Sequence, residues 1–275
     1  MDKREQLIKQ GFCIFDKIVD KATIGRMVDA SERVLAAQPK EHFEQQKSTG
    51  SMINTNQDPA FSEIIAYPGT LKAFASIGFP SPKFSAGYII SKPPSSPRLF
   101  WHQDWWGWTD PSSYMDGPQQ VFVMYYLTDT NRGNGCLRLV PGSHRKRNRL
   151  HDELKEPHAV YRRIEDPTHI AYADAPGVVD VSVKVGDVVI GDARILHAAH
   201  ANDSNDRRTV ITLWFFPDFA ALSEDLKASI NGDGRHQWPE DWPSEARARI
   251  DPLRPIYAGT RKPMEWNRIP GPQLR

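Results

Sequence analysis

The sequence predicts a mainly β protein with added helices, built as a jelly roll that rests on a helical N-terminal region. Roughly eight short runs of β-forming residues, separated by turn residues, lie between residues 83 and 216. Helical periodicity dominates residues 1–82 instead, and no repeat or low-complexity linker divides the chain. We therefore expect a single domain over residues 1–275, with helical support over 1–82, a jelly-roll core over 83–216, and a helix with an irregular tail over 217–275.

The N-terminal region is expected to be mostly helical. Its helices are predicted before residue 12 and at 22–37, 59–67 and 70–77. Asp20 can cap the second of these helices, in which apolar residues recur at about 3.6-residue spacing. The run Phe12 to Phe15 predicts a short strand, and the polar stretch 40–58 predicts a long loop.

The core strands are predicted from β-branched and aromatic runs bounded by Gly, Pro, Asn and Asp. They are 83–91, the run around His102, 121–127, 136–140, 178–185, 188–190 and 208–216. Residues 145–176 are polar and show little periodicity. Their basic cluster at 145–149 predicts a solvated loop, with a lid or an anion-facing patch as the alternative.

The C-terminal region begins with a predicted helix over 219–230. The tail from 231 to 275 is rich in Pro, Trp and Arg and has no clear period. We expect this tail to pack over the domain or onto a partner subunit, so a homo-oligomer is possible through it.

Composition excludes several classes of function. Lys and Arg together number 35 against 34 for Asp and Glu, so the net charge is +1 and nothing indicates a nucleic-acid or acidic-membrane partner. The charged N-terminus predicts no signal peptide, and no apolar run approaches the roughly 18 residues of a membrane span. Cys13 and Cys136 are too few for a disulfide framework. We expect a cytoplasmic protein with reduced thiols.

The most informative stretch is Phe-Trp-His-Gln-Asp-Trp-Trp-Gly-Trp, residues 100–108. His102 and Asp104 are two residues apart, so on an extended strand their side chains point to the same face and converge as two metal ligands must. The alternative is a half-buried strand with a solvated His and Asp. The aromatic side chains Trp105, Trp106 and Trp108 predict the wall of a small-molecule site.

A third ligand is expected from the segment 186–200, which offers two histidines. His197 closes an apolar run and could point inward, whereas His200 lies nearer a polar loop. Two neutral imidazoles and one carboxylate on one face of an octahedron suit non-haem Fe(II). Behind this segment, Arg207 or Arg208 could bind the far carboxylate of a 2-oxoacid bidentately.

The order of these motifs resembles the phytanoyl-CoA dioxygenase family. His-Gln-Asp is followed by Asn-Gly-Cys-Leu-Arg-Leu-Val-Pro-Gly-Ser-His, Gly-Asp-Val-Val-Ile and Leu-His-Ala-Ala-His-Ala-Asn-Asp-Ser with an arginine behind it. The resemblance covers about residues 83–216 and implies the double-stranded β-helix, a cupin-like jelly roll. It also implies Fe(II), 2-oxoglutarate and O2 as cofactor and cosubstrates.

Residue by residue, the resemblance implies that His102, Asp104 and His197 bind Fe(II) and are catalytic. The arginine eleven residues after the distal histidine is Arg208, which is implied to bind 2-oxoglutarate. The chain departs from the family at Ala199, where several relatives carry a serine that helps to hold the cosubstrate. Phe122 and Met124 likewise stand where relatives often present polar or indole groups, and Tyr88 and Tyr126 are the expected substitutes for these contacts.

The function that the resemblance implies is hydroxylation of an unactivated C–H bond of a small molecule, with release of succinate and CO2. A related halogenase would need Gly or Ala in place of Asp104. Two alternatives remain: a zinc-dependent hydrolase on a jelly-roll scaffold, because the same ligands bind zinc, and a non-catalytic jelly-roll binding protein. The identity of the substrate is not predicted.

Overall fold

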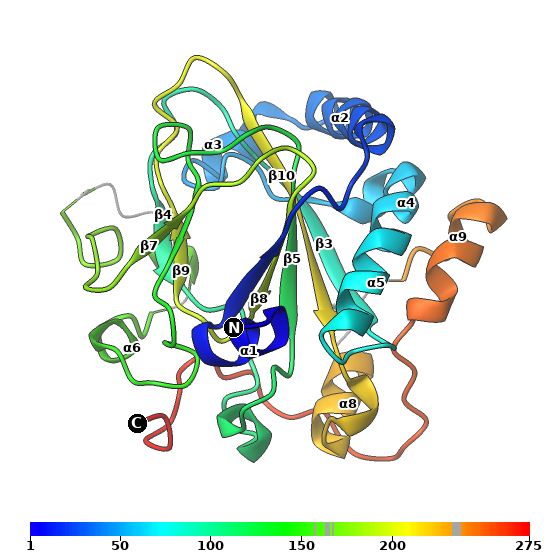
Figure 1. The fold of residues 1–275 in the computed structure, drawn as a ribbon, viewed down its shortest axis with the longest axis vertical. Helices are drawn as coiled ribbons and strands as arrows, with labels where there is room; N and C mark the ends of the chain where they lie inside the picture. The colour runs from blue at the N-terminus through cyan, green and yellow to red at the C-terminus, as the bar shows by residue number, and fades with distance from the viewer. Residues whose placement is uncertain (157, 163–165, 167, 233–237) are drawn as a thin grey trace.

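The computed structural model describes residues 1–156, 158–162, 166, 168–232 and 238–275, and the parts of the predicted loop and tail between these ranges lie outside it. Two antiparallel sheets face each other, and helices cover the outer face of the larger sheet (Figure 1). The larger sheet has the order β1-β8-β5-β10-β3-β2 and the smaller one β4-β9-β6-β7. This arrangement confirms the predicted mainly β jelly roll with helical N-terminal support.

The strands agree closely with the predicted runs. The larger sheet contains β1 (Phe12–Phe15), β2 (Ile53–Asn54), β3 (Lys83–Lys92), β5 (Val121–Tyr126), β8 (Val188–Asp192) and β10 (Arg208–Phe216). The smaller sheet contains β4 (Leu99–His102), β6 (Leu137–Leu139), β7 (Val179–Val181) and β9 (His197–Ala199). The predicted strand 178–185 is therefore shorter, and β9 was not predicted as a strand of its own.

The N-terminal helices are α1 (Lys3–Gln10), α2 (Lys21–Ala36), α4 (Ser62–Ile65) and α5 (Pro68–Ser76). The side chain of Asp20 accepts a hydrogen bond from Thr23 N at 2.9 Å, so it caps α2 as predicted. The predicted loop 40–58 is wrong in part, because it contains α3 (Lys40–Gln45) and β2. β2 pairs with β3, at Ile53 opposite Ile89, and such long-range pairing leaves no local signal in so short a run.

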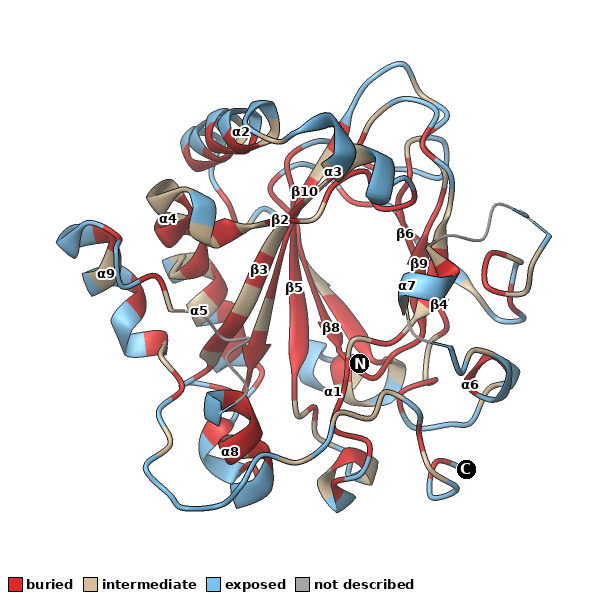
Figure 2. Cartoon of the chain, turned by 180° about the vertical axis from the view of Figure 1, so that it is seen from behind, coloured by how far each residue is buried: buried red, intermediate tan, exposed pale blue. Residues whose placement is uncertain are grey.

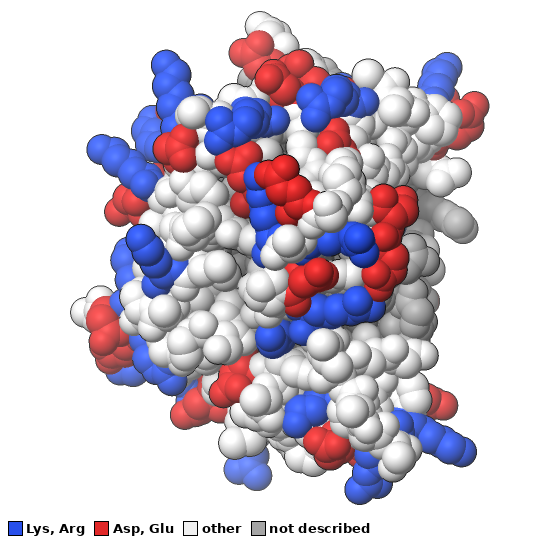
Figure 3. Space-filling model, turned by 90° about the vertical axis from the view of Figure 1, so that its right-hand side faces the viewer, with Lys and Arg blue, Asp and Glu red and all other residues white. Residues whose placement is uncertain are grey.

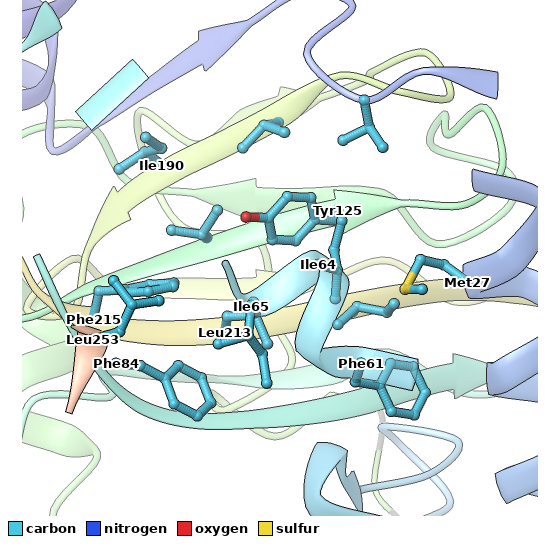
Figure 4. Close-up of a cluster of buried hydrophobic side chains, with 14 of the residues drawn as sticks. Met27, Phe61, Ile64, Ile65, Phe84, Tyr125, Ile190, Leu213, Phe215 and Leu253 are labelled. Carbon is cyan, nitrogen blue, oxygen red and sulfur yellow. The ribbon is translucent and has the colours of Figure 1, made fainter. Parts of the chain in front are cut away.

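Both faces of the central strands β5 and β10 are buried, which explains their continuous apolar sequence. Tyr125 and Leu213 belong to a core between the larger sheet and the helices, together with Met27 and Phe61 (Figure 4). Their neighbours along each strand point the opposite way, into the space between the sheets. The alternate residues of β10 that face this space are Arg208, Val210, Thr212 and Trp214.

Two further short helices, α6 (Arg149–Glu153) and α7 (His158–Tyr161), lie in the segment predicted as a polar loop. In the C-terminal region, the predicted helix 219–230 is replaced by a 3-10 turn, Phe219–Ala221, and then α8 (Glu224–Gly232). The two are separated because Leu222 has an extended backbone. The tail also contains α9 (Ser244–Ile250), which packs beside α4 and was not predicted.

The outer faces of the helices are exposed while the strands beneath them are buried (Figure 2). On the helical side of the molecule, acidic and basic side chains are interspersed (Figure 3). Arg26 pairs with Glu63 at 2.6 Å and Arg249 with Glu245 at 2.7 Å. Among the helices in the described ranges, none combines the length and the hydropathy that crossing a membrane requires.

Candidate metal centre and cavity

Three predicted ligands come together between the sheets. The ligand atoms of His102, Asp104 and His197 lie within 4.8 Å of one another. His102 Nε2 is 3.6 Å from Asp104 Oδ1, and His197 Nε2 is 3.5 Å from Asp104 Oδ2. Distances of this size leave room for one metal ion between the three side chains.

Strand pairing explains why residues so far apart in the sequence meet. His102 ends β4 and stands opposite His197 of β9 in the antiparallel ladder. Asp104 follows the end of β4, and its backbone N–H donates to Ala193 O at 2.9 Å. The two-residue spacing therefore brings His102 and Asp104 together as predicted, although Asp104 lies just beyond the strand.

Each ligand is held in the orientation that a metal ion requires. The Nδ1 atom of His102 lies 3.0 Å from Phe100 O, and that of His197 lies 3.0 Å from Ile195 O, so Nε2 is the atom that each ring turns to the centre. Trp214 Nε1–H donates to Asp104 Oδ2 at 2.9 Å. Such outer contacts fix the tautomer and position of metal ligands.

The protonation states suit a cation. Burial, helped by the nearby His197, lowers the pKa of His102 to about 3, so this imidazole is neutral near pH 7. Burial alone would raise the pKa of Asp104, but His197, His102 and Arg268 outweigh it and hold this pKa below its usual value. A neutral histidine and an ionised carboxylate are the forms that bind metal.

A cavity of about 350 Å³ opens beside the three ligands. Its aromatic lining residues are Tyr88, Phe100, Trp106, Tyr126, Trp214 and Trp266. Its charged lining residues, within the described ranges, are Asp104, Arg162, Arg208 and Arg268. A second cavity of about 290 Å³ shares His102, His158, Trp266 and Arg268 with the first.

Of the two adjacent arginines, Arg208 lines the cavity and is buried, whereas Arg207 donates to Ser91 O on the neighbouring strand β3. Arg208 Nη2 donates to Gly135 O at 2.7 Å, but its buried Nε has no hydrogen-bond partner among the described residues. The hydroxyl of Thr212, which faces the same cavity, is also buried without a partner there. These unsatisfied groups fit the far carboxylate of 2-oxoglutarate, which would accept from both.

Tyr88 and Tyr126, predicted as further cosubstrate contacts, both line the cavity. The ring of Tyr88 meets that of Trp214 edge-on, with centroids 5.8 Å apart. The buried hydroxyl of Tyr126 donates to Met124 Sδ at 3.4 Å, a weak acceptor. Burial lowers the pKa of Arg208, and the nearby Tyr126 acts against this by raising it. The two groups therefore share one region of the cavity.

The predicted tryptophan wall needs correction. All three tryptophans belong to a buried cluster with α8 residues such as Leu226, and of the three only Trp106 also lines the cavity. Trp105 Nε1 donates to Ser113 Oγ at 2.8 Å inside that cluster. Richness in aromatic residues did not distinguish a cavity wall from a core, because both bury aromatic rings.

His200 points away from the cavity, and its Nε2 lies 2.6 Å from Asp180 Oδ1. Cys136, Asp180 and His200 form a second group whose potential ligand atoms lie within 4.8 Å of one another. Asp180 also pairs with Arg132 at 3.2 Å, so its carboxylate is already balanced. We interpret this group as a link between β6, β7 and β9.

The basic cluster at 145–149 does not line either cavity. Its arginines pair with acidic neighbours on the surface, for example Arg145 with Asp116 and Arg147 with Asp152, both at 2.6 Å. The solvated interpretation is therefore the one that fits. The sequence prediction missed several cavity residues, among them His158, Arg162, Thr212, Trp214, Trp266 and Arg268. The period-two pattern of β10 could have indicated Thr212 and Trp214, which share a face with Arg208.

A jelly roll that presents two histidines and one carboxylate to an open cavity defines the scaffold of a mononuclear non-haem metal enzyme. The model of the phytanoyl-CoA dioxygenase family, PhyH, matches residues 7–210. The chain belongs to this family, and the predicted family is confirmed. The family's requirements, Fe(II), 2-oxoglutarate and O2, agree with the predicted cofactors.

Two curated relatives illustrate the similarity. Phytanoyl-CoA dioxygenase 1 of Oryza sativa subsp. japonica is 28% identical over 160 residues, which are 57% of this chain and 52% of the rice protein. Ectoine dioxygenase of Bordetella parapertussis is 30% identical over 116 residues, 39% of this chain and 37% of that relative. The similarity thus spans about half of the rice protein and less of the bacterial one.

Solved structures share the fold. HygX from Streptomyces hygroscopicus, solved with nickel and 2-oxoglutarate bound, has a TM-score of 0.59 at 20% identity, covering 78% of this chain and 87% of its own. The epimerase SnoN, in complex with Fe3+, alpha ketoglutarate and nogalamycin RO, has a TM-score of 0.59 at 14% identity over 99% and 96% of the two chains. At these identities the likeness establishes the fold alone.

Proposed function

We propose that this protein is an Fe(II)- and 2-oxoglutarate-dependent dioxygenase that hydroxylates an unactivated C–H bond of a small molecule, with release of succinate and CO2. The observation that carries the proposal is the presence, in one cavity, of the His102/Asp104/His197 set and the unsatisfied donors of Arg208 and Thr212. Residues 1–275 would act as one catalytic domain. A cytoplasmic location fits the free thiols of Cys13 and Cys136.

In this proposal His102, Asp104 and His197 would hold Fe(II), since two imidazoles and one carboxylate are a ligand set that suits this ion. Arg208 binds the far carboxylate of 2-oxoglutarate, and Thr212 donates to the same group. When bound, the iron and its cosubstrate supply the oxidising chemistry that no side chain can provide. Trp214 keeps the Asp104 carboxylate turned to the metal by the hydrogen bond from Nε1–H.

The walls of the cavity contribute orientation and exclusion of water. Phe100 packs against the ring of His102 at 5.1 Å between centroids, and Phe122 packs against His197 at 4.9 Å. Trp106 and Trp266 stack with centroids 4.8 Å apart and planes 10° apart, which closes one side. An apolar and aromatic site of this kind fits a small molecule with a hydrocarbon portion near the metal.

The alternatives have less support. A zinc hydrolase needs a general base beside the metal, and Asp104 is the one carboxylate among the described residues that line the cavity. A non-catalytic binding protein would give no reason for both imidazoles to be turned with Nε2 inward. The predicted homo-oligomer and the absence of nucleic-acid or membrane partners stay predictions.

The test combines metal analysis with oxygen consumption. We expect the purified protein, loaded anaerobically with Fe(II), to consume O2 and form succinate only when 2-oxoglutarate is added. In Arg208→Gln, adding 2-oxoglutarate should no longer start O2 consumption or succinate formation. Arg207→Gln serves as the matched control. Tight zinc binding without consumption of 2-oxoglutarate would favour the hydrolase, and failure to bind any metal would favour the binding protein.

A further inference from the structure

Part of the cavity is not used by the metal or by 2-oxoglutarate. We call it the outer wall and define it as His158, Arg162, Trp266 and Arg268. His158 and Arg162 come from the segment between β6 and β7, and Trp266 and Arg268 come from the C-terminal tail. The tail lies beyond residues 7–210, the range that the family model matches. The outer wall is therefore the place to search for what this chain recognises.

Arg162 stands one helical turn after His158, since its N–H donates to His158 O at 3.1 Å. Residues four apart in a helical turn share a face, so both side chains line the cavity. His158 in turn meets the ring of the metal ligand His102 with centroids 5.2 Å apart. This turn thus brings a guanidinium to the neighbourhood of the metal centre.

The donors of Arg162 are poorly used. Its Nη2 donates only to Met52 Sδ at 3.2 Å, and its buried Nε has no partner among the described residues. Sulfur in a thioether is a weak acceptor. Nε and Nη2 form one edge of the guanidinium, the edge that binds a carboxylate or phosphate side-on. Burial lowers the pKa of Arg162, as expected when a cation is removed from water without a strong partner.

The second arginine is held differently. Arg268 Nη1 donates to Gln103 O at 3.1 Å and to Asp104 O at 2.9 Å, so it fixes the backbone of the metal-binding stretch. The tail is anchored there because Asn267 N donates to Trp106 O at 2.8 Å. Burial lowers the pKa of His158, and the charges of Arg268 and Arg162 lower it further. The two arginines therefore add to the positive potential of one region.

The balance of charge is the decisive argument. Once the centre is loaded, the formal charges sum to zero over iron(II), the dianion of 2-oxoglutarate, Asp104 and Arg208. Asp104 is the one carboxylate among the described lining residues, and it is committed to the metal. Arg162 therefore faces the cavity with no counter-charge among the described lining residues. A partly buried cation in this position favours an anion in the space that remains for the substrate.

We propose that the substrate carries an oxyanion, a carboxylate or a phosphate-type group, which Arg162 binds at the outer wall while a C–H bond of the same molecule faces the metal centre. This rests on the proposed function. The apolar remainder of the substrate would lie against Phe100, Trp106 and Trp266. Binding of a substrate oxyanion by Arg162 also explains why its Nε lacks an acceptor among the described residues.

The test uses pairs of probes that differ in charge: hexanoate with hexanamide, and hexyl phosphate with hexanol. Binding to the full chain loaded with Fe(II) and 2-oxoglutarate is measured without oxygen, by calorimetry and by the shift in thermal unfolding. We expect the anion of at least one pair to bind at least about tenfold more tightly than its neutral partner, the range of a charge-assisted bidentate contact. The pair that discriminates more strongly identifies the oxyanion as a carboxylate or a phosphate.

Variants assign the effect to Arg162. Arg162→Gln should remove the preference for the anion, and Arg162→Lys should restore only part of it because the fork is lost. Lys155→Gln is the matched control, because it removes a cation of the same segment that lines the second cavity only. The affinity for 2-oxoglutarate should stay unchanged in all three variants.

Several outcomes would overturn the proposal. They are equal binding of both members of each pair, no binding of any anion, an equal loss in Lys155→Gln, or a loss of 2-oxoglutarate affinity in Arg162→Gln. If the protein fails to bind Fe(II) and 2-oxoglutarate, the proposed function fails instead, and the same pairs are measured on the metal-free protein. A preference for anions that Arg162→Gln abolishes there would still support the anion site.

Discussion

His102 and His197 stand directly opposite each other in the antiparallel ladder of β4 and β9, with ring centroids 4.1 Å apart. Each ring has its Nδ1 at 3.0 Å from the carbonyl oxygen of the residue two positions earlier in the chain. The sheet therefore places and orients both imidazoles before any metal arrives. Folding has therefore already fixed the conformations of both imidazoles, so metal binding loses little further side-chain entropy at these two ligands.

The first prediction concerns the choice of the third ligand. His102→Ala, Asp104→Ala and His197→Ala should each abolish turnover and weaken Fe(II) binding, because each removes an inward-facing ligand. His200→Ala should retain most of both, since His200 bonds to Asp180 outside the cavity. Iron content after anaerobic loading and succinate formation are the measurements. An equal loss in His200→Ala would show that the wrong histidine had been assigned.

The second prediction concerns the two adjacent arginines. Arg208→Lys keeps the charge but loses the fork, so the apparent KM for 2-oxoglutarate should rise by at least about tenfold with far less effect on Fe(II) affinity. Arg207→Lys should be nearly silent, because Arg207 bonds to Ser91 outside the cavity. Steady-state kinetics measure both variants. Reversed phenotypes would mean that the register of β10 is off by one residue.

The third prediction tests the support of Asp104. Trp214→Phe keeps an aromatic ring but removes the Nε1–H that donates to Asp104 Oδ2 at 2.9 Å. Loss of an outer contact to a metal ligand typically weakens metal affinity by about 10- to 100-fold, and we expect a loss in this range. Trp238→Phe is the control, because the Nε1–H of Trp238 donates to Asp251 far from the metal ligands. Competition with a chelator gives the affinities, and equal values for both variants would contradict the assignment.

The fourth prediction concerns the stability of the metal-free protein in acid. Burial lowers the pKa of His151 to about 4, against 6.5 in the unfolded chain. Between these values the unfolded chain binds a proton that the folded protein does not, so the free energy of unfolding should fall as the pH falls from about 6.5 to about 4. The half-buried His102 and His158, whose pKa values are lowered to about 3 and about 2, act in the same direction.

His151→Gln isolates one of these contributions. Glutamine can still accept from Asn148 N, as His151 Nδ1 does at 3.0 Å, so the cap of α6 is kept while the titration is lost. The slope of unfolding free energy against pH should decrease by up to about 1.4 kcal/mol per pH unit in that window. Urea unfolding at several pH values measures it. An unchanged slope would mean that His151 is not neutral in the fold.

Local patterns in the sequence were sufficient for most strands and for His102 and Asp104, two of the three side chains that meet beside the cavity. His102 and Asp104 were selected by their two-residue spacing, whereas Arg208 was selected over Arg207 by the family spacing of eleven residues from His197, because alternation alone does not say which of the two faces inward. The same alternation extends to Thr212 and Trp214, which the prediction omitted. Trp105 and Trp108 lie in a buried cluster rather than along the cavity, which the sequence could not indicate because composition cannot tell which side of a turn faces a cavity.

The outer wall could not have been predicted in the same way. His158 and Arg268 are more than 100 residues apart, and they meet only because the segment with α7 and the C-terminal tail both fold back over β4. Neither segment has a periodic pattern from which this contact could be predicted. The short helix α9 was missed for a related reason, since its buried residues Ala246 and Ile250 pack against other elements and stabilise it more than its own propensity does.

The central claim is that His102, Asp104 and His197 bind Fe(II) in a way that leaves two positions for 2-oxoglutarate. The most direct measurement is visible absorption of the protein under nitrogen with one equivalent of Fe(II), before and after addition of 2-oxoglutarate. The account predicts a weak charge-transfer band that appears only with both components and is lost in Asp104→Ala. Binding of zinc in preference to iron, with no such band for the iron-loaded protein, would contradict it.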